Sequence, residues 1–367
     1  MQPDVVIVGA GPAGIASAIA ASRKGFCVTV LDYRKPPIDK PCGEGLLPEA
    51  VRALRSLGLE LDRSTAFPFS GIRFCDGHSS ASARIAPGQA CGLRRTVLHQ
   101  MLVDRATQLG VQFRWGTRVS EFHSSHVCAA GDRISFGWLI GADGHNSHVA
   151  VWAGLNSKRR FHSRFGFRRH YAVEPWSDCV EVHWGARCQL FVTPTGAEEV
   201  CIALLSSDPH LGIEHALSQF PGVARRLRNA RPITREAGAV SMLRRARAVA
   251  RGNVALVGDA SCAIDGIAGQ GLSLAFQQAL ALGNALARQD LTHYAAEHRR
   301  ITTVPVRITH LMLLMSSSAW LRRKVLRLFA ANPALFANMI AIHTRQAIHS
   351  DLKVTHVASL GWRLLWA

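Results

Sequence analysis

The amino-acid sequence predicts an α/β fold with a parallel sheet, a second antiparallel sheet and a helical C-terminal tail. Residues 4–32 follow the order strand, glycine turn, helix and strand, as in the opening of a Rossmann-like parallel sheet. Residues 159–205 instead alternate apolar and polar positions between Pro and Gly turns, which is typical of antiparallel strands. The tail is apolar, basic and helical in pattern, with a break near Pro333.

The parallel domain is expected to be assembled from separated segments, because strands of its kind recur late in the chain. Residues 111–115, 138–141 and 254–257 read as buried strands, and a helix follows the last of them. We therefore expect three regions: a nucleotide domain from 1–75, 91–155 and 245–300, an antiparallel domain from 76–90 and 156–244, and a helical region from 301–367.

The glycine turn near the N-terminus predicts a dinucleotide site. Gly9 permits the tight turn, Gly11 lets the backbone approach a pyrophosphate, and Gly14 lets the helix pack closely on the strand. The pyrophosphate would lie at the N-terminus of the helix that starts near Pro12, where backbone N–H groups are free. Asp32 ends the second strand eighteen residues after Gly14, where a carboxylate accepts hydrogen bonds from ribose hydroxyls.

Composition narrows the classes of partner. With 48% hydrophobic and 19% charged residues, the chain is expected to be an ordered globular protein. Its nine cysteines show no Cys-x-x-Cys pair and no His/Cys ligand spacing, which predicts reduced thiols in the cytoplasm and no structural metal. The net charge of +18 comes without a nucleic-acid-binding module, so we expect no nucleic-acid partner. The charge is either a solvated basic surface or serves to attract anionic cofactors, an anionic membrane or an acidic carrier protein.

Later motifs resemble those of a known superfamily. Gly141-Ala-Asp143-Gly is similar to the DG motif of flavin-dependent monooxygenases, with Ser147 and Val149 at the family's spacing. Gly258-Asp259 followed by Gly269-Gln-Gly271 resembles the GD motif, and the helix from Arg95 resembles the superfamily's arginine helix. The chain therefore resembles FAD-dependent oxidoreductases of the p-hydroxybenzoate hydroxylase and geranylgeranyl reductase superfamily.

This resemblance implies FAD in the Rossmann-like domain, with Asp259 on the ribityl chain and the backbone of Val119 against the adenine. It also implies NAD(P)H as the reductant, although Ala150 stands where the family has a closing arginine, which puts nicotinamide docking through that residue in doubt. The expected cofactor-binding residues are Gly9, Gly11, Pro12, Ala13, Gly14, Asp32, Tyr33, Arg34, Gly43, Arg95, Val119, Asp143, Gly258, Asp259, Gly269, Gly271 and Leu272.

The reaction type stays open between two alternatives. Lys40-Pro-Cys-Gly-Glu-Gly resembles the Lys-Pro-Cys-Gly-Gly-Gly run of the reductase branch, but the aromatic Trp-x-Phe-Pro element of that branch is not reproduced. We favour hydroxylation of a hydrophobic aromatic or polyketide-like molecule through a flavin C4a-hydroperoxide. The alternative is saturation of an isoprenoid or polyene double bond. A halogenase is disfavoured because Trp-x-Trp-x-Ile-Pro is missing, and a GDI-like lipid escort protein because the cofactor motifs are intact.

Candidate catalytic residues are Cys42, Glu44 and Asp265. A carboxylate near a flavin edge can be desolvated, which raises its pKa and suits it to proton transfer. Cys42 is either a small buried residue or a thiol that tunes the flavin or donates a proton.

The tail from 306 to 329 is expected to pack on the catalytic domain. The alternative is that its apolar positions cover a substrate channel, or that its arginines contact the inner face of a membrane. The oligomeric state is not indicated by the sequence.

Overall fold

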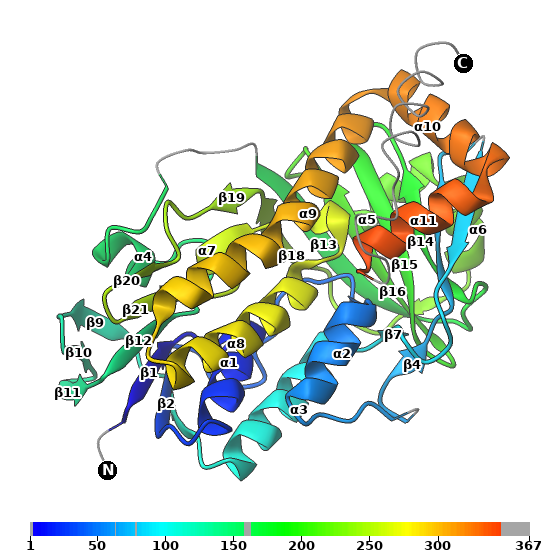
Figure 1. Cartoon of the computed structure of the whole chain (residues 1–367). Coiled ribbons are helices and arrows are strands. Elements are labelled where there is room, and N and C mark those ends of the chain that lie inside the picture. The colour runs from blue at the N-terminus through cyan, green and yellow to red at the C-terminus, as the bar shows by residue number, and fades with distance from the viewer. Residues whose placement is uncertain (1–2, 63, 78, 158–162, 346–367) are drawn as a thin grey trace.

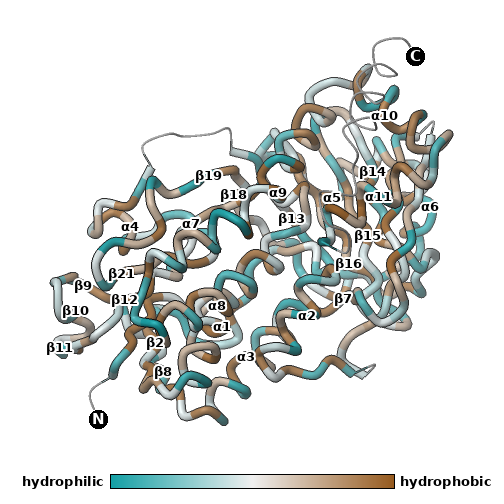
Figure 2. The backbone as a smooth tube through the Cα atoms, viewed as in Figure 1, coloured by the Kyte–Doolittle hydropathy of each residue, from teal (hydrophilic) through white to brown (hydrophobic). Residues whose placement is uncertain are grey.

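The computed structural model describes residues 3–62, 64–77, 79–157 and 163–345. It consists of two lobes, each built on a large sheet, with one long helix, α9 (Leu291–Ser317), running across both (Figure 1). Apolar residues are concentrated where helices meet the sheets, and hydrophilic positions lie mainly on the outside (Figure 2). Our prediction of an α/β fold with a second sheet and C-terminal helices is confirmed.

The first lobe contains a six-stranded sheet whose central strand is the predicted N-terminal one. Its neighbours run parallel, so that Val5 pairs with both Trp138 and Val28, and only the edge strand β20 is antiparallel. The strand order is β20 (Ala250–Arg251), β21 (Val254–Leu256), β12 (Trp138–Gly141), β1 (Val5–Val8), β2 (Val28–Asp32) and β8 (Gln112–Trp115). Three separated parts of the chain therefore build this sheet, as the sequence pattern predicts.

Both faces of this sheet are covered, because its strands are apolar on both sides. Ile7 and Val30 face the helices α1 (Pro12–Ser22), α2 (Pro48–Ser56), α3 (Arg95–Gln108) and α8 (Gly271–Ala287). Val6 and Leu139 face the opposite core. That core is covered by a small antiparallel sheet of β9 (Val119–Phe122), β10 (His126–Ala129) and β11 (Asp132–Ser135) and by α4 (His148–Trp152).

The second lobe contains an eight-stranded sheet. Its order is β17 (Arg231–Pro232), β13 (Ser163–Ala172), β16 (Glu199–Ser206), β15 (Cys188–Gly196), β14 (Cys179–Trp184), β5 (Gly71–Cys75) and β6 (Ser80–Arg84), with β18 (Ala237–Met242) also paired to β13. The strands are antiparallel except for β5 and β14. Since β5 already belongs to this sheet, the expected domain boundary at residue 75 falls inside the β5–β6 hairpin.

Each face of the second sheet also meets helices. One face packs on α5 (Ile213–Ala216) and α6 (Pro221–Leu227). The other packs on α9, α10 (Ala319–Ala331) and α11 (Pro333–His343). Three short strands, β3 (Gly45–Leu46), β4 (Phe67–Pro68) and β7 (Cys91–Gly92), form a separate sheet that contacts β15.

The tail is helical and broken before Pro333, as predicted, and it has a second break at Ser318, whose hydroxyl accepts a hydrogen bond from Leu321 N. The end of the predicted helical region, residues 346–367, lies outside the described part. Among the described helices, none is by itself long and apolar enough to cross a bilayer. The pair α10 and α11 meets that test only jointly, with a bend of 108° between the two helices.

Pro305 lies inside α9 and removes one backbone donor, which leaves the carbonyl of Ile301 without its helical partner. The side chain of Arg345, at the end of α11, supplies the missing bond. Its Nη2 lies 2.5 Å from Ile301 O and 3.0 Å from Arg300 O, and its Nη1 donates to Gln277 Oε1 of α8 at 2.9 Å. One guanidinium therefore joins α9, α8 and the end of α11.

We predict that Arg345→Met destabilises the protein by about 1–3 kcal/mol, because a buried carbonyl loses its donor. In a Pro305→Ala background the loss should be smaller, since the alanine at that position would supply a backbone N–H to Ile301 O. Chemical denaturation of the four proteins of this double-mutant cycle measures the difference. Equal losses in both backgrounds would show that Arg345 does not compensate for Pro305.

Candidate functional site

A cavity of about 760 Å³ lies between the two lobes. Every predicted cofactor-binding residue lines it except Gly14, which lies behind the glycine turn. Of the three candidate catalytic residues, Cys42 and Glu44 line the cavity and Asp265 does not. Residues predicted from four distant motifs are therefore brought to one continuous space.

The glycine turn is shaped by two close backbone contacts. A Cβ on Gly9 would lie 2.4 Å from Ala142 O, and Gly9 has φ +104, which disfavours any other residue. A Cβ on Gly14 would lie 1.9 Å from Gly9 O. A Cβ on Gly11, by contrast, would meet no protein atom within 4 Å. Protein packing therefore explains Gly9 and Gly14, whereas Gly11 keeps the cavity wall open to a ligand.

The carboxylate of Asp32 fixes the turn to the end of β2. It accepts hydrogen bonds from Ala10 N at 2.7 Å and from Arg34 N at 2.8 Å, and it is buried. Tyr33 is exposed beside it, with the guanidinium groups of Arg34 and Arg118 over its ring at 5.1 and 5.2 Å. This end of the cavity has the features expected for a ribose and an adenine.

On the first-lobe side of the cavity wall, two buried polar atoms have no hydrogen-bond partner within the described chain: Nε of Arg95 and Oδ1 of Asp143. Burial lowers the pKa of Arg95, although Cys42 and Asp259 partly oppose that effect. The other oxygen of Asp143 accepts from the backbone of His148 at 2.7 Å and so holds the start of α4. Buried polar groups are normally satisfied, so these two atoms indicate a polar ligand. FAD fits this wall, since it offers anionic and hydroxyl groups.

The start of α8 provides a second site for negative charge. Its N-terminal residue Gly271 faces the cavity, and the preceding Gln270 gives no side-chain cap, so the first backbone N–H groups remain available. Nearby, Asp259 forms an ion pair with Lys40 at 2.8 Å. Burial alone would raise the pKa of Asp259, but the Lys40 ammonium outweighs it and holds the pKa below its usual value. The carboxylate is therefore ionised at neutral pH.

Glu44 is buried and fully engaged. One carboxylate oxygen accepts from Arg95 N and Arg168 Nη1, both at 2.9 Å, and the other lies 2.6 Å from His170 Nε2. Arg168 and His170 belong to β13 of the second lobe. The sequence indicated a free acid or base here. The geometry instead gives Glu44 the role of anchoring the Cys42–Gly45 loop to the second sheet.

Cys42 and Asp265 differ in their access to the cavity. Cys42 lines it, and burial raises the pKa of its thiol, which therefore stays protonated at neutral pH. Asp265 is buried behind the loop that precedes α8, where it accepts from Arg164 Nη1 and from Ile267 N, each at 3.0 Å. The catalytic assignment of either residue remains a prediction. Of the two, only Cys42 is among the residues that line the cavity.

The second-lobe half of the cavity is apolar and rich in aromatic side chains. It lies between the β5, β14 and β15 strands and the three C-terminal helices. We call it the apolar chamber, and its lining includes Phe69, Ile72, Phe74, Val180, Val182, Phe191, Ile308, Leu311, Met312, Met315, Phe329, Phe336, Met339 and Ile340. The tail therefore forms one wall of the chamber, in line with the alternative of a channel cover.

His343 is a polar residue of this region that the sequence motifs did not identify. Its Nε2 lies 2.9 Å from Ala268 O, so the hydrogen is on Nε2 and the buried Nδ1 is left as a bare acceptor. Burial lowers the pKa of His343 to about 4, so the ring is neutral at pH 7. In the sequence, His343 is marked only as a polar residue at the end of an apolar helical run. This pattern is common in helices and does not single out a functional residue.

Two histidines next to the predicted cofactor motifs, His99 and His145, have structural surroundings. His99 is buried behind the glycine turn with Nε2 at 3.0 Å from Ala10 O. The backbone carbonyl of His145 accepts a hydrogen bond from the side chain of Arg244, and burial lowers the pKa of the His145 ring. His162 lies outside the described residues.

Comparison with known proteins agrees with this geometry. Residues 2–184 match the family described as FAD binding domain. The menaquinone reductase of Mycolicibacterium smegmatis is 32% identical over 190 residues, 48% of this chain and 46% of that protein. A 3-(3-hydroxy-phenyl)propionate/3-hydroxycinnamic acid hydroxylase of Mycobacterium sp. (strain JLS) is 33% identical over 169 residues, 42% of this chain and 30% of that protein. These alignments span less than half of each relative's length.

A longer alignment joins the chain to the digeranylgeranylglycerophospholipid reductase 1 of Methanothermobacter thermautotrophicus. The two are 25% identical over 310 residues, 78% of this chain and 77% of that protein. Among solved structures, a flavoprotein/dehydrogenase from Cytophaga hutchinsonii superposes with a TM-score of 0.77 at 18% identity, over 93% of this chain and 92% of that one. The 2-methyl-3-hydroxypyridine-5-carboxylic acid oxygenase superposes with a TM-score of 0.70 at 20% identity, over 84% and 90%. These two likenesses show a shared fold.

The two glycines of the turn allow a matched test of cofactor binding. Gly11→Ala should leave the stability of the FAD-free protein within roughly 0.5 kcal/mol of wild type, because the new methyl group meets no protein atom. It should lower FAD affinity at least about tenfold, because the methyl occupies the cavity wall. Gly14→Ala should destabilise even the FAD-free protein, by about 1–3 kcal/mol.

FAD titration by fluorescence quenching and thermal unfolding of both variants measure these effects. Unchanged FAD affinity in Gly11→Ala would contradict the assignment of this wall to the pyrophosphate.

Proposed function

We propose that this chain, a member of the superfamily of FAD-dependent oxidoreductases, hydroxylates a hydrophobic aromatic or polyketide-like molecule with NAD(P)H as reductant. The observation that carries this proposal is the apolar chamber, which is continuous with the wall assigned to FAD. Bound and reduced, the flavin supplies activated oxygen. The chain supplies a dry, aromatic-lined space in which a greasy ring is held beside it.

The charged groups of the site support hydroxylation over double-bond reduction. Reduction of a double bond needs a proton donor next to the substrate. The two carboxylates first considered for that task are held by Arg168 and Arg164 and do not project freely into the chamber. The free N-terminus of α8 would stabilise negative charge on the reduced cofactor, a need common to both reactions.

The second candidate is saturation of an isoprenoid or polyene double bond. It is favoured by the 310-residue alignment with the Methanothermobacter thermautotrophicus reductase and by the protonated thiol of Cys42 in the cavity wall. In that reaction Cys42 would hold the proton at Sγ and donate it to one carbon of the double bond, and the reduced cofactor would supply the hydride for the other carbon. The products separate the two proposals, because hydroxylation adds one oxygen atom and saturation adds two hydrogens.

The test uses the FAD-loaded enzyme, NADH or NADPH, and ¹⁸O₂ with panels of alkyl phenols and polyprenyl substrates. Hydroxylation predicts one ¹⁸O atom in the product. It also predicts a transient absorbance, before oxidised flavin returns, when the reduced enzyme meets oxygen in a stopped-flow instrument. A product that gains two hydrogens and no ¹⁸O would overturn hydroxylation in favour of the reductase.

Chamber occupancy is tested with a matched pair on α9. Met312→Trp fills the chamber and should raise KM for the hydrophobic substrate at least about tenfold with unchanged FAD content. Leu314→Trp, at a position 57% exposed on the same helix, should leave KM unchanged.

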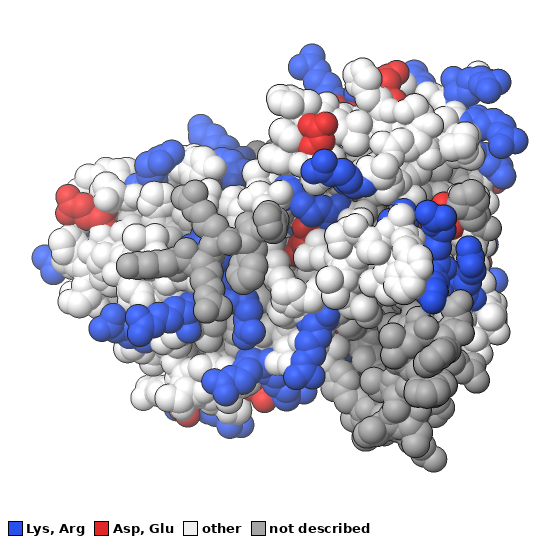
Figure 3. Space-filling view, turned by 90° about the horizontal axis from the view of Figure 1, so that it is seen from above, with Lys and Arg blue, Asp and Glu red and all other residues white. Residues whose placement is uncertain are grey.

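We also propose that the corner between α9 and α10 contacts an anionic lipid surface at the cytoplasmic face of a membrane. Leu311 lines the chamber and is partly exposed, and it is followed by exposed Leu314 and Trp320. Four cationic residues of α10, Arg322, Arg323, Lys324 and Arg327, follow these apolar residues along the chain. In Figure 3, Lys and Arg side chains are spread over the visible face with few Asp and Glu among them. Exposed apolar groups beside cations suit an anionic bilayer, from which a greasy substrate could enter the chamber.

This proposal predicts cosedimentation with phosphatidylglycerol vesicles and little with phosphatidylcholine vesicles. Replacing Leu314 and Trp320 by Ser should reduce binding at least about fivefold, because two apolar anchors are lost. Val151→Ser removes an equally exposed apolar residue from the first lobe and should have no effect. Binding that is unchanged by the double variant would contradict this surface. If the enzyme binds an acidic carrier protein and no vesicles, the lipid assignment is also wrong.

A further inference from the structure

The β9–β10 hairpin of the first lobe carries a cluster of polar side chains that takes no part in the proposed oxidoreductase reaction. Its two strands are closed by a hydrogen bond from His123 N to His126 O at 2.9 Å, so that Ser124 and Ser125 form the turn. Farther along the hairpin, Cys128 pairs with Glu121.

Opposite residues of an antiparallel pair point to the same face, and so do residues two apart on one strand. Glu121, His123, His126 and Cys128 therefore share one face. The other face carries Phe122 and Val127, which pack in the core of the lobe. All four polar groups are thus placed together by the pleat, and the apolar residues between them fix the register.

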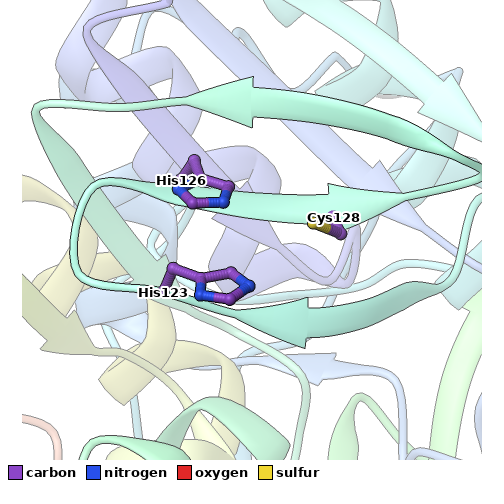
Figure 4. A group of neighbouring side chains, drawn as sticks. All are labelled: His123, His126 and Cys128. Carbon is purple, nitrogen blue, oxygen red and sulfur yellow. The ribbon is translucent and has the colours of Figure 1, made fainter.

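The three nitrogen- and sulfur-bearing side chains are close enough to share one ion. One ligand atom from each of His123, His126 and Cys128 lies within 4.8 Å of the others. The two imidazole rings are stacked, with centroids 4.2 Å apart and planes 5° from parallel, and Cys128 lies beside them on the strand of His126 (Figure 4). One further observation points to a ligand: within the described chain, Nδ1 of His126 is buried without a hydrogen-bond partner. Glu121 Oε2 lies 3.2 Å from His123 Nε2, so a carboxylate oxygen is also at hand.

We propose that this face of the hairpin is a binding site for a transition-metal ion of the zinc class. Its ligands are the imidazoles of His123 and His126, the thiolate of Cys128, and an oxygen of Glu121 or of water. A tetrahedral zinc site needs ligand atoms roughly 3.3–3.7 Å apart, so the two imidazole rings would turn out of their stacked arrangement to bring their nitrogens to the ion. Sulfur and nitrogen ligands select zinc-like ions over magnesium or calcium.

Binding balances in charge and protons. Formation of the metal–sulfur bond releases the thiol proton of Cys128 to solvent, and Glu121 exchanges its contact with His123 for the ion. The thiolate and the carboxylate together neutralise the two positive charges of the ion. The site would therefore add no net positive charge next to Arg133, which lies opposite Cys128 on the neighbouring strand β11.

The spacing His123-x-x-His126-x-Cys128 is a His/Cys spacing that the sequence analysis did not recognise, and this proposal departs from its prediction of no structural metal. One other such group occurs among the described residues, formed by Glu44, His170 and Cys201. There the carboxylate is already bonded to Arg168 and to Arg95 N, and the group is fully buried. It therefore serves as an internal comparison.

The test is titration of the FAD-loaded enzyme with Co²⁺ under reducing conditions, after removal of bound metal by EDTA. We expect one equivalent and d–d absorption of tetrahedral cobalt, read at wavelengths longer than those the flavin absorbs. Zn²⁺ should displace the cobalt, and calorimetry with Zn²⁺ gives the affinity. Cys128→Ser and His126→Ala should each lower it at least about tenfold. Cys27→Ser, at an exposed cysteine elsewhere, should leave it unchanged.

Each remaining outcome overturns the proposal. Loss of binding in Cys201→Ser with retention in Cys128→Ser would move the ion to the buried group. Wild-type protein that binds no stoichiometric metal would exclude the site. FAD content and thermal unfolding of every variant, measured without metal, separate loss of a ligand from loss of the fold.

Discussion

The buried carboxylate of Glu44 is the interaction on which the shape of the site depends. A buried charge is tolerated only when paired and hydrogen-bonded, and here the partners come from both lobes: the backbone of Arg95 from the first, Arg168 and His170 from the second. Arg168 also holds Asp39 at 2.7 Å, at the start of the same loop. Removal of one member would leave another charge uncompensated, so the loop between 39 and 45 is fixed to β13 as a unit.

The cavity that this fixed loop lines has two halves of different character. On the first-lobe side, open glycines, a helix N-terminus and two unpartnered polar atoms form a wall suited to a charged dinucleotide. On the second-lobe side, the sheet and the C-terminal helices present almost only apolar side chains. Water is excluded on one side and charge is accommodated on the other, which is the division that flavin chemistry on a hydrophobic substrate needs.

The sequence predicted those parts of the fold that are determined by residues close together along the chain. The strand–turn–helix at residues 4–32, the helix from Arg95 and the helix after Gly271 were found because glycine turns and apolar periodicity are local signals. The pairing of Glu44 with Arg168, 124 residues away, and of Asp265 with Arg164, 101 residues away, could not be found in this way. Both acids looked available for catalysis because arginines are numerous in this chain and no local pattern marks the two that pair.

The continuity of α9 has a mechanical consequence. Its first half is fixed to the first lobe, where Tyr294 donates to Leu256 O at 2.6 Å, and its second half lines the chamber. The guanidinium of Arg345 braces the helix at Pro305, the point where it would otherwise bend most easily. A strut of about 40 Å therefore spans both lobes and opposes a hinge between them. The wall that α10 and α11 add to the chamber is attached to this strut at both ends, through the break at Ser318 and through Arg345, so the strut also sets the width of the chamber.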